Sequence, residues 1–217
     1  MKTKTLDELV IVEDPAIPLI RQWAAAAENH IEILPPADIR EEVLLEVQVT
    51  THSTLGAMAY DTGGILVDHG WLRFLGSGHL KFKRTLSSWN RGRSDGMYLV
   101  ADDAVGGFFA INGGAFGGGT GNVYHWSSDA LEWEPLRMGL TDFFRWSLTS
   151  RLADFYQDLR WPRWKDDLKS LSPDQCFNFY PFLWTKEGSI DGSDRRPIPA
   201  AEAFDLKMDI VRQLSQP

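Results

Sequence analysis

The stretch GMYLVADDAVGGFFAINGGAFGGGTGNVYHWSSDALEWEPL, residues 96–136, decides the expected fold. It consists of short apolar runs, rich in aromatic and β-branched residues, that are separated by Asp, Asn, Ser or Gly. This pattern is typical of an antiparallel meander, and it predicts four strands. The runs at 97–101 and 108–111 are apolar throughout. We therefore expect both faces of these two strands to be covered, as in the centre of a sheet packed against helices.

The last of the four runs has a different pattern. Leu131 and Trp133 alternate with Glu132 and Glu134. Successive side chains of a strand point to opposite faces. The run therefore predicts a strand with one buried, apolar face and one acidic face that meets solvent or a partner.

The sequence on both sides of the meander predicts helices and further strands. Apolar residues recur at three- and four-residue intervals in four segments, the first of them opened by Asp14-Pro15: 15–29, 37–47, 140–159 and 200–214. Shorter apolar runs predict strands at 57–60, 64–67 and 71–75, with a turn at 68–70. The predicted fold class is α+β, with a central, mostly antiparallel sheet flanked by N-terminal and C-terminal helices.

Length and composition indicate a single domain. The chain has 217 residues, and 43% of them are hydrophobic, which is ample for one core. Within this domain we expect a helical N-terminal part (1–50), a sheet core (55–137) and C-terminal helices (140–217).

The charge balance and the cysteine content restrict partners and location. Thirty acidic and 22 basic side chains leave a net charge of −8, which repels polyanions, so we expect no nucleic-acid partner. The single cysteine, Cys176, cannot form an internal disulfide. No apolar segment has the length that an export signal or a membrane span needs. We therefore expect a cytoplasmic protein that does not bind membranes, and the sequence leaves its oligomeric state open.

The usual catalytic and nucleotide-binding motifs are missing from the sequence. Five histidines are scattered without metal-ligand spacing, and we expect His125, in a predicted strand, to be a hydrogen-bonded or surface imidazole rather than a metal ligand. Cys176 lies among aromatic residues and is expected to be a buried, inert thiol. We expect no catalytic residue, no metal and no cofactor.

The glycine-rich run 113–121 invites comparison with a phosphate-binding loop. A phosphate cradle needs a helix N-terminus after the glycines, and usually a lysine, serine or threonine just inside that helix. Here a strand follows, and no lysine is near. The run therefore predicts a flexible hairpin loop, opened by Asn112-Gly113, that can serve as a mobile contact surface.

Several segments carry a resemblance to known families. Together, four segments of this chain resemble the core of the SUKH superfamily, which is known for bacterial toxin-immunity proteins. They are YLVADD (98–103), GFFAIN (107–112), GNVYHW (121–126) and Phe143-Phe144. The whole chain resembles more closely an uncharacterised bacterial domain-of-unknown-function family, marked by GGILVDHGWLR (63–73) and Asp174-Gln175. The resemblance implies a SUKH-like α+β fold and a role in binding other proteins rather than in catalysis.

One functional hypothesis is a non-catalytic, cytoplasmic protein-binding module of the toxin-immunity type, which binds and neutralises a partner protein. Many bacterial toxins act on nucleic acid and carry basic active sites, so the expected partner is a basic toxin domain. The contact surface would consist of the acidic strand and the glycine loop, that is, Asp129, Glu132, Glu134, Gly117, Gly118 and Gly119.

The alternative hypothesis is a small hydrolase or small-ligand-binding protein with a site at Asp68, His69, Asp102 and Asp103. Asp102 and Asp103 end a strand and begin a hairpin, where aspartate is favoured for its local hydrogen bonds, so a turn is the simpler interpretation of this pair. Asp102 and Asp103 also could not act together as a general acid and base, because adjacent strand residues point to opposite faces of the sheet.

Overall fold

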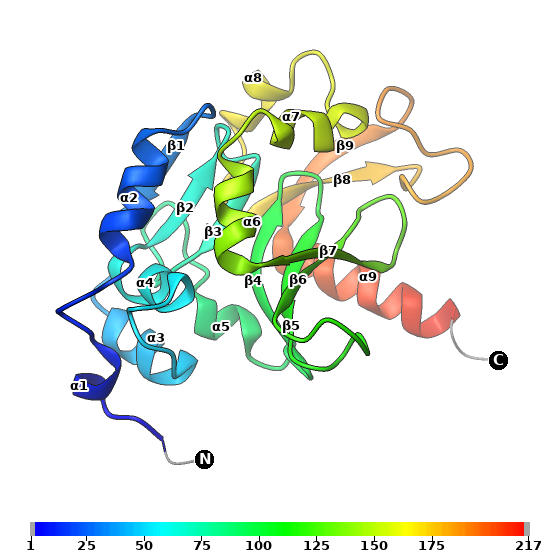
Figure 1. Cartoon of the computed structure of the whole chain (residues 1–217). Helices are drawn as coiled ribbons and strands as arrows, with labels where there is room; N and C mark the ends of the chain where they lie inside the picture. Colours follow the sequence, from blue (N-terminus) through cyan, green and yellow to red (C-terminus); the bar gives the residue numbers. More distant parts are fainter. Residues whose placement is uncertain (1–2, 215–217) are drawn as a thin grey trace.

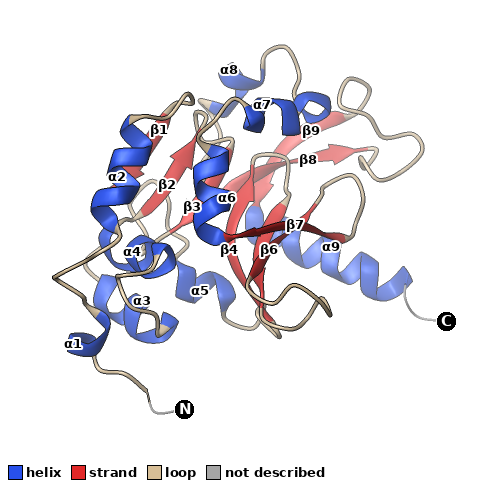
Figure 2. Ribbon diagram, viewed as in Figure 1, coloured by secondary structure: helices blue, strands red, loops and turns tan. Residues whose placement is uncertain are grey.

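The computed structural model describes residues 3–214, and its centre is a seven-stranded antiparallel sheet with helices on both faces (Figure 1, Figure 2). The strands lie in the sheet in chain order: β1 (Ile31–Leu34), β2 (Gly64–Val67), β3 (Leu72–Leu75), β4 (Met97–Asp103), β5 (Phe108–Asn112), β6 (Asn122–Trp126) and β7 (Trp133–Gly139). A separate hairpin pairs β8 (Gln175–Tyr180) with β9 (Asp194–Pro199). The helices are α1 (Leu6–Leu9), α2 (Ile17–Ala25), α3 (Arg40–Val47), α4 (Thr54–Asp61), α5 (Leu86–Asn90), α6 (Leu140–Ser147), α7 (Arg151–Phe155), the 3₁₀ helix η1 (Gln157–Leu159), α8 (Trp164–Leu168) and α9 (Ala200–Leu214). The predicted α+β class is confirmed.

The register of the strands assigns side chains to the two faces of the sheet. Phe74, Phe109 and His125 lie on one face, since they are connected through directly opposed positions on neighbouring strands. Helix α6 covers this face, which we call the α6 face. Its Phe143 stacks on Phe109 with ring centroids 4.8 Å apart and lies 5.3 Å from Phe74. These aromatic contacts form the centre of the core on this side.

The opposite face, which we call the α9 face, carries Arg73, Asp102 and Phe108 at mutually opposed positions. Phe204 of α9 packs edge-on against Phe108 with ring centroids 5.0 Å apart. The β8–β9 hairpin docks on the same face, because the guanidinium of Arg73 donates a hydrogen bond to the backbone carbonyl of Gln175 in β8. The α9 face therefore combines an aromatic core with a buried cationic side chain.

The predicted meander is confirmed, with one change at its last strand. Strands β4 to β7 are antiparallel neighbours, and β4 and β5 are almost completely buried, as their apolar runs predicted. The last strand begins at Trp133 instead of Leu131 and continues to Gly139. Leu131 has a φ of 54°, in the left-handed region, so this residue belongs to the preceding turn.

The prediction of one continuous helix over 140–159 is wrong, because the segment forms α6, α7 and η1 in succession. The hydroxyls of Ser147 and Thr149 donate hydrogen bonds to backbone carbonyls three residues earlier, which competes with helix continuation. The Asn29 side chain donates to the carbonyls of the same two residues, at 2.8 and 2.9 Å. The break is therefore fixed by a distant segment of the chain.

The strand predicted at 57–60 is also wrong, since these residues belong to α4. The helix begins at a cap in which the hydroxyl of Ser53 accepts a hydrogen bond from the amide of Gly56 at 3.0 Å. Gly56 lies so close to the carbonyl of Thr50 that a Cβ atom would come within 2.1 Å of its oxygen. A short apolar run does not by itself distinguish a strand from a buried helix.

Three strands were not predicted, and two helix starts differ. β1 lies in the N-terminal part expected to be helical, and β8 and β9 lie in the expected C-terminal helices. The helix predicted after Asp14-Pro15 begins at Ile17, and the one predicted from residue 37 begins at Arg40. Helix α9 spans 200–214 as predicted. Within residues 3–214, no helix is both long enough and apolar enough to cross a bilayer.

Candidate functional site

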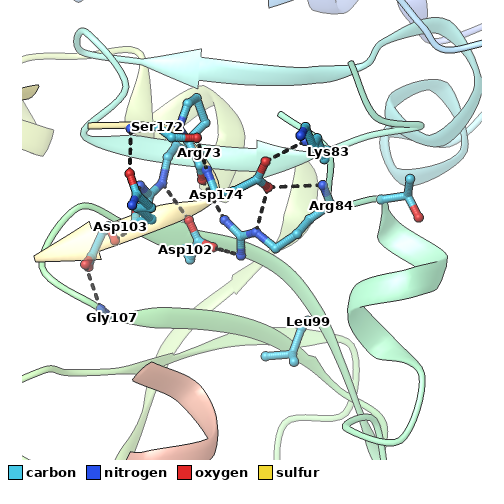
Figure 3. A network of polar contacts seen from close by, with 12 residues as sticks. Arg73, Lys83, Arg84, Leu99, Asp102, Asp103, Gly107, Ser172 and Asp174 are labelled. Carbon is cyan, nitrogen blue, oxygen red and sulfur yellow. Dashed lines mark hydrogen bonds and ion pairs between the residues drawn. The ribbon is translucent and has the colours of Figure 1, made fainter. Parts of the chain in front are cut away.

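A chain of four charged side chains crosses the α9 face, and we call it the buried charge network: Arg73, Asp102, Arg84 and Asp174 (Figure 3). Arg73 Nε lies 2.6 Å from Asp102 Oδ1, and both side chains are 0% exposed. Arg84 contacts the second carboxylate oxygen of Asp102, and its Nε lies 3.2 Å from Asp174 Oδ1. Positive and negative charges therefore alternate from the interior of the sheet to the protein surface.

The network connects three parts of the chain. Arg73 binds the carbonyl of Gln175 in β8, and Asp174, just before β8, accepts hydrogen bonds from the backbone amides of Lys83 (2.8 Å) and Arg84 (3.1 Å) (Figure 3). Lys83 and Arg84 precede α5. The sheet, the segment leading into α5 and the β8–β9 hairpin are thus held together by charge-assisted hydrogen bonds.

The electrostatics of the network favour the charged form of Arg84. Burial alone lowers the pKa of a guanidinium, but Asp102 and Asp174 outweigh this effect and raise the pKa of Arg84 above its ordinary value. Because Arg73 and Asp102 are fully buried, a solute cannot reach them while the protein is folded. The arrangement therefore acts as a structural connection between segments.

Asp103 belongs to the α6 face, opposite to its neighbour Asp102, as predicted for adjacent strand residues. Its Oδ1 accepts hydrogen bonds from the amides of Val105 (3.0 Å) and Gly107 (2.7 Å), which are the local turn contacts expected of aspartate at the start of a hairpin. Its Oδ2 accepts a hydrogen bond from the hydroxyl of Tyr156 at 2.9 Å. The turn interpretation of the pair is therefore confirmed for Asp103 and wrong for Asp102, whose carboxylate is bound by Arg73 and Arg84 instead of local amides.

Asp103 and Tyr156 have shifted pKa values of opposite direction. Burial would raise the pKa of Asp103, but His125, the amide of Gly107 and Tyr156 together hold it below its usual value. Burial and the neighbouring Asp103 raise the pKa of Tyr156. His125 is 4% exposed, its Nε2 lies 3.8 Å from Asp103 Oδ2, and its ring stacks on Phe109. It therefore lies in the core, and its Nε2 has no hydrogen-bond partner among residues 3–214, which differs from the predicted hydrogen-bonded or surface imidazole.

The four residues of the alternative site do not converge. Asp68 is buried and its Oδ2 lies 2.6 Å from Arg160 Nη2. His69, in the same turn, is exposed and stacks on His30. Asp102 and Asp103 point to opposite faces of the sheet, as described above. Within residues 3–214, no cluster of three or more His, Cys, Asp or Glu side chains has an arrangement that could hold a metal ion.

The predicted acidic surface lies at the end of the sheet. We call Asp129, Glu132 and Glu134 the acidic edge. All three are exposed, and none forms an ion pair with another residue of the described range 3–214. Glu132 directly precedes β7, while Glu134 lies in it, opposite His125 of β6. Asp129 accepts a hydrogen bond from the hydroxyl of Ser127.

The glycine-rich run forms the hairpin loop between β5 and β6, as predicted. The loop is anchored to the neighbouring strands: the ring of Phe116 lies 4.5 Å from that of Tyr124 and 5.0 Å from that of Trp133 in β7. The hydroxyl of Tyr124 donates to the carbonyl of Gly118 at 2.8 Å. The loop therefore approaches β7, and the three glycines predicted to contact a partner, Gly117, Gly118 and Gly119, are exposed.

Cys176 is buried, as predicted, with 1% of its surface exposed. Burial raises the pKa of its thiol to about 11, so very little thiolate exists at neutral pH. We expect the folded protein to react slowly with a thiol reagent and to react fast only in denaturant. Cys176→Ala should leave any binding activity unchanged. Rapid labelling of the native protein near pH 7 would contradict this expectation and would revive an enzymatic role.

Sequence reasoning did not identify Arg73 or Arg84 as parts of a site. A signal was present for Arg73, because it is the one charged residue in the apolar run of β3, and a buried charge requires a partner. Arg84 lies in the basic segment before α5, where a solvated side chain is the ordinary expectation. Nothing local shows that it bonds to residues on two other segments.

Comparisons with known proteins give one family and two relatives. The chain is 39% identical over 217 residues to the uncharacterised protein YbfG of Escherichia coli (strain K12), covering 98% of this chain and 100% of the relative. It is 41% identical over 188 residues to an uncharacterised protein of Haemophilus influenzae (strain ATCC 51907 / DSM 11121 / KW20 / Rd), covering 83% of this chain and 82% of that relative.

No solved structure is significantly similar to the chain. The resemblance to the SUKH superfamily therefore stays a prediction. Residues 6–203 match the family described as protein of unknown function DUF2625. The match covers nearly the whole chain, including the sheet, the buried charge network and the acidic edge. This chain therefore belongs to the DUF2625 family.

Proposed function

We propose that this protein is a binding module whose contact surface is the acidic edge of β7 and whose partner is a protein with a basic surface. The observation that supports the proposal is the presence of three exposed carboxylates without ion-pair partners, within residues 3–214, at the free end of the sheet. A surface of one charge sign speeds the encounter with an oppositely charged partner and excludes others. Neutralisation of a basic toxin domain, the role implied by the SUKH resemblance, is the specific form of this proposal.

The backbone of β7 favours contact through side chains over the addition of a partner strand. Pro135 lacks an amide hydrogen, and Arg137 has a φ of 57° at an irregularity in the pairing of β6 with β7. Proline and bulges are common means of protecting an edge strand from pairing with another chain. Side chains are therefore the groups that this end of the sheet offers to a partner, with Glu134 in β7 and Glu132 and Asp129 just before it. The anchored glycine loop beside it forms a border of the same surface.

The test compares a charge-reversed variant with a matched control. Glu132→Lys combined with Glu134→Lys reverses two charges of the acidic edge. Glu13→Lys combined with Glu187→Lys makes the same change of net charge at exposed positions without ion pairs in the described residues. Tagged proteins would be used to recover a partner from the bacterium that encodes the chain, at low and at high salt. We expect the edge variant to recover about tenfold less partner at low salt and the control to match the wild type.

Two results would contradict the proposal. Unchanged recovery by a folded edge variant would remove the acidic edge from the interface. Failure of the wild-type protein to recover any basic partner would count against the binding-module function itself. Circular dichroism of both variants verifies that they are folded before the comparison.

A further inference from the structure

A cleft of about 670 Å³ lies at the other end of the sheet from the acidic edge. Its walls are His30, just before β1, the turn between β2 and β3, and the segment around α8. The volume lies within the range of pockets that bind small molecules. None of the side chains of the acidic edge lines it, so it is separate from the proposed protein-binding surface.

Two histidines from different segments line this cleft and stack on each other. The rings of His30 and His69 have centroids 4.6 Å apart and are nearly parallel, at 9°. The position of His69 is set by the turn between β2 and β3, in which Asp68 and His69 have φ values of 49° and 62°. Aspartate and histidine are among the residues that adopt the left-handed region most readily after glycine, and such a pair is common in tight hairpin turns. The turn thus places an imidazole at the cleft.

Asp68, the neighbour of His69 in this turn, does not line the cleft. Asp68 is bound by Arg160, whose guanidinium lies 4.2 Å from the ring centroid of Trp164 and 4.9 Å from that of Trp71. The acidic group is therefore neutralised within the wall. His69 remains as the side chain of the turn that lines the cleft.

Cations outnumber carboxylates by three to two in the lining of the cleft. Its basic residues are Arg163, Lys165 and Lys169, and its acidic residues are Glu32 and Asp166. Both acids already have partners: Glu32 lies 2.7 Å from Lys81, and Asp166 lies 2.8 Å from Lys169 and 4.0 Å from Arg163. The ammonium of Lys165 has no carboxylate partner among residues 3–214 and lies 5.2 Å from the centre of the Trp164 ring. The lining of the cleft therefore carries a positive charge, although the whole protein has a net charge of −8.

The titration of His69 is consistent with this local field. Partial burial is the main cause that lowers the pKa of His69; His30, Lys165 and Lys169 lower it further, while Asp68 raises it. The positive charges of Lys165 and Lys169, which disfavour a charged His69, also attract an anion. An imidazole at such a place donates a hydrogen bond in its neutral form, and a bound anion favours its protonation.

We propose that this cleft binds the phosphate group of a small phosphorylated ligand. Lys165 and the imidazoles of His30 and His69 would supply donors to the phosphate oxygens, which accept charge-assisted hydrogen bonds from several directions at once. The cleft is larger than a phosphate group, so it leaves room for an attached organic part. The chemistry fits free phosphate and a phosphomonoester, and the experiment distinguishes them.

The experiment is isothermal titration of the full-length chain in a phosphate-free buffer. The probes are inorganic phosphate, adenosine monophosphate and, as a neutral control, adenosine. Two variants remove donors: Lys165→Ala and His69→Asn, since asparagine tolerates the left-handed turn. Lys186→Ala is the matched control, because Lys186 is exposed, has no ion pair among the described residues and lies outside the cleft. We expect saturable binding that weakens about tenfold in each donor variant and stays unchanged in the control.

The results distinguish free phosphate from a phosphomonoester as the ligand, and they show when the proposal is wrong. Binding of both anionic probes means that phosphate alone suffices, and binding of adenosine monophosphate alone means that a phosphomonoester is required; either result supports the site. Three results would overturn it: no saturable binding of either anion, adenosine binding as tightly as its monophosphate, or an equal loss in Lys186→Ala.

Discussion

Replacing Asp102 with alanine is expected to lower the free energy of unfolding by about 3–5 kcal/mol. The substitution removes the carboxylate that lies 2.6 Å from Arg73 Nε and also contacts Arg84. Arg73 would stay fully buried, with only backbone carbonyls to receive its hydrogen bonds. A buried charge without a counter-charge carries a desolvation penalty that such hydrogen bonds only partly offset. Urea denaturation, followed by circular dichroism, measures the change.

Two further variants identify the origin of that loss. Asp174→Ala removes the carboxylate at the solvent end, which is 24% exposed, and leaves Arg84 paired with Asp102, so we expect a loss of only about 1 kcal/mol. Arg73→Met combined with Asp102→Leu removes both buried charges and should be more stable than Asp102→Ala alone. If the double variant is as unstable as the single one, the unpaired charge is not the cause. A loss below about 1 kcal/mol in Asp102→Ala would refute the role of the network.

The buried charge network shows which part of a site can be predicted from sequence. The sequence indicated that Asp102 and Asp103 lie on opposite faces, because strand geometry alone dictates it, and the structure agrees. The partners of Asp102 could not be predicted, since Arg73 reaches it across a strand pair and Arg84 comes from a loop. Asp174 is more distant still along the chain, and its place at the network follows only from the docking of β8.

The fold was predictable where interactions are local. Meander strands follow each other in the sequence, so their alternating runs and turns are sufficient to identify them. The β8–β9 hairpin has a long connection, and β9 reads DRRPIP, with two prolines and three charges, which is unlike an ordinary strand. The interruption after α6 depends on Asn29, more than a hundred residues earlier in the chain. Such contacts between distant segments override the helical periodicity.

Replacing Trp71 with alanine is the second change for which a large effect is expected, a loss of about 3–5 kcal/mol in unfolding free energy. Trp71 is fully buried, and its ring meets those of Tyr156 at 5.4 Å and Trp164 at 5.1 Å. The guanidinium of Arg160 lies 4.9 Å from the same ring. A cavity at this point would remove contacts from the sheet, from the end of α7 and from α8 together.

The Trp71→Phe variant separates the destabilisation caused by the cavity from any effect of losing the indole N–H. That group has no hydrogen-bond partner among residues 3–214, so Trp71→Phe loses volume but no hydrogen bond, and we expect less than about half the destabilisation of Trp71→Ala. Hydrogen exchange should show protection lost first in α8, because Trp164 rests on the removed ring. Equal stability of Trp71→Ala and wild type, within about 1 kcal/mol, would mean that α8 is held by other contacts. In that case the wall of the phosphate cleft would not depend on the core beneath it.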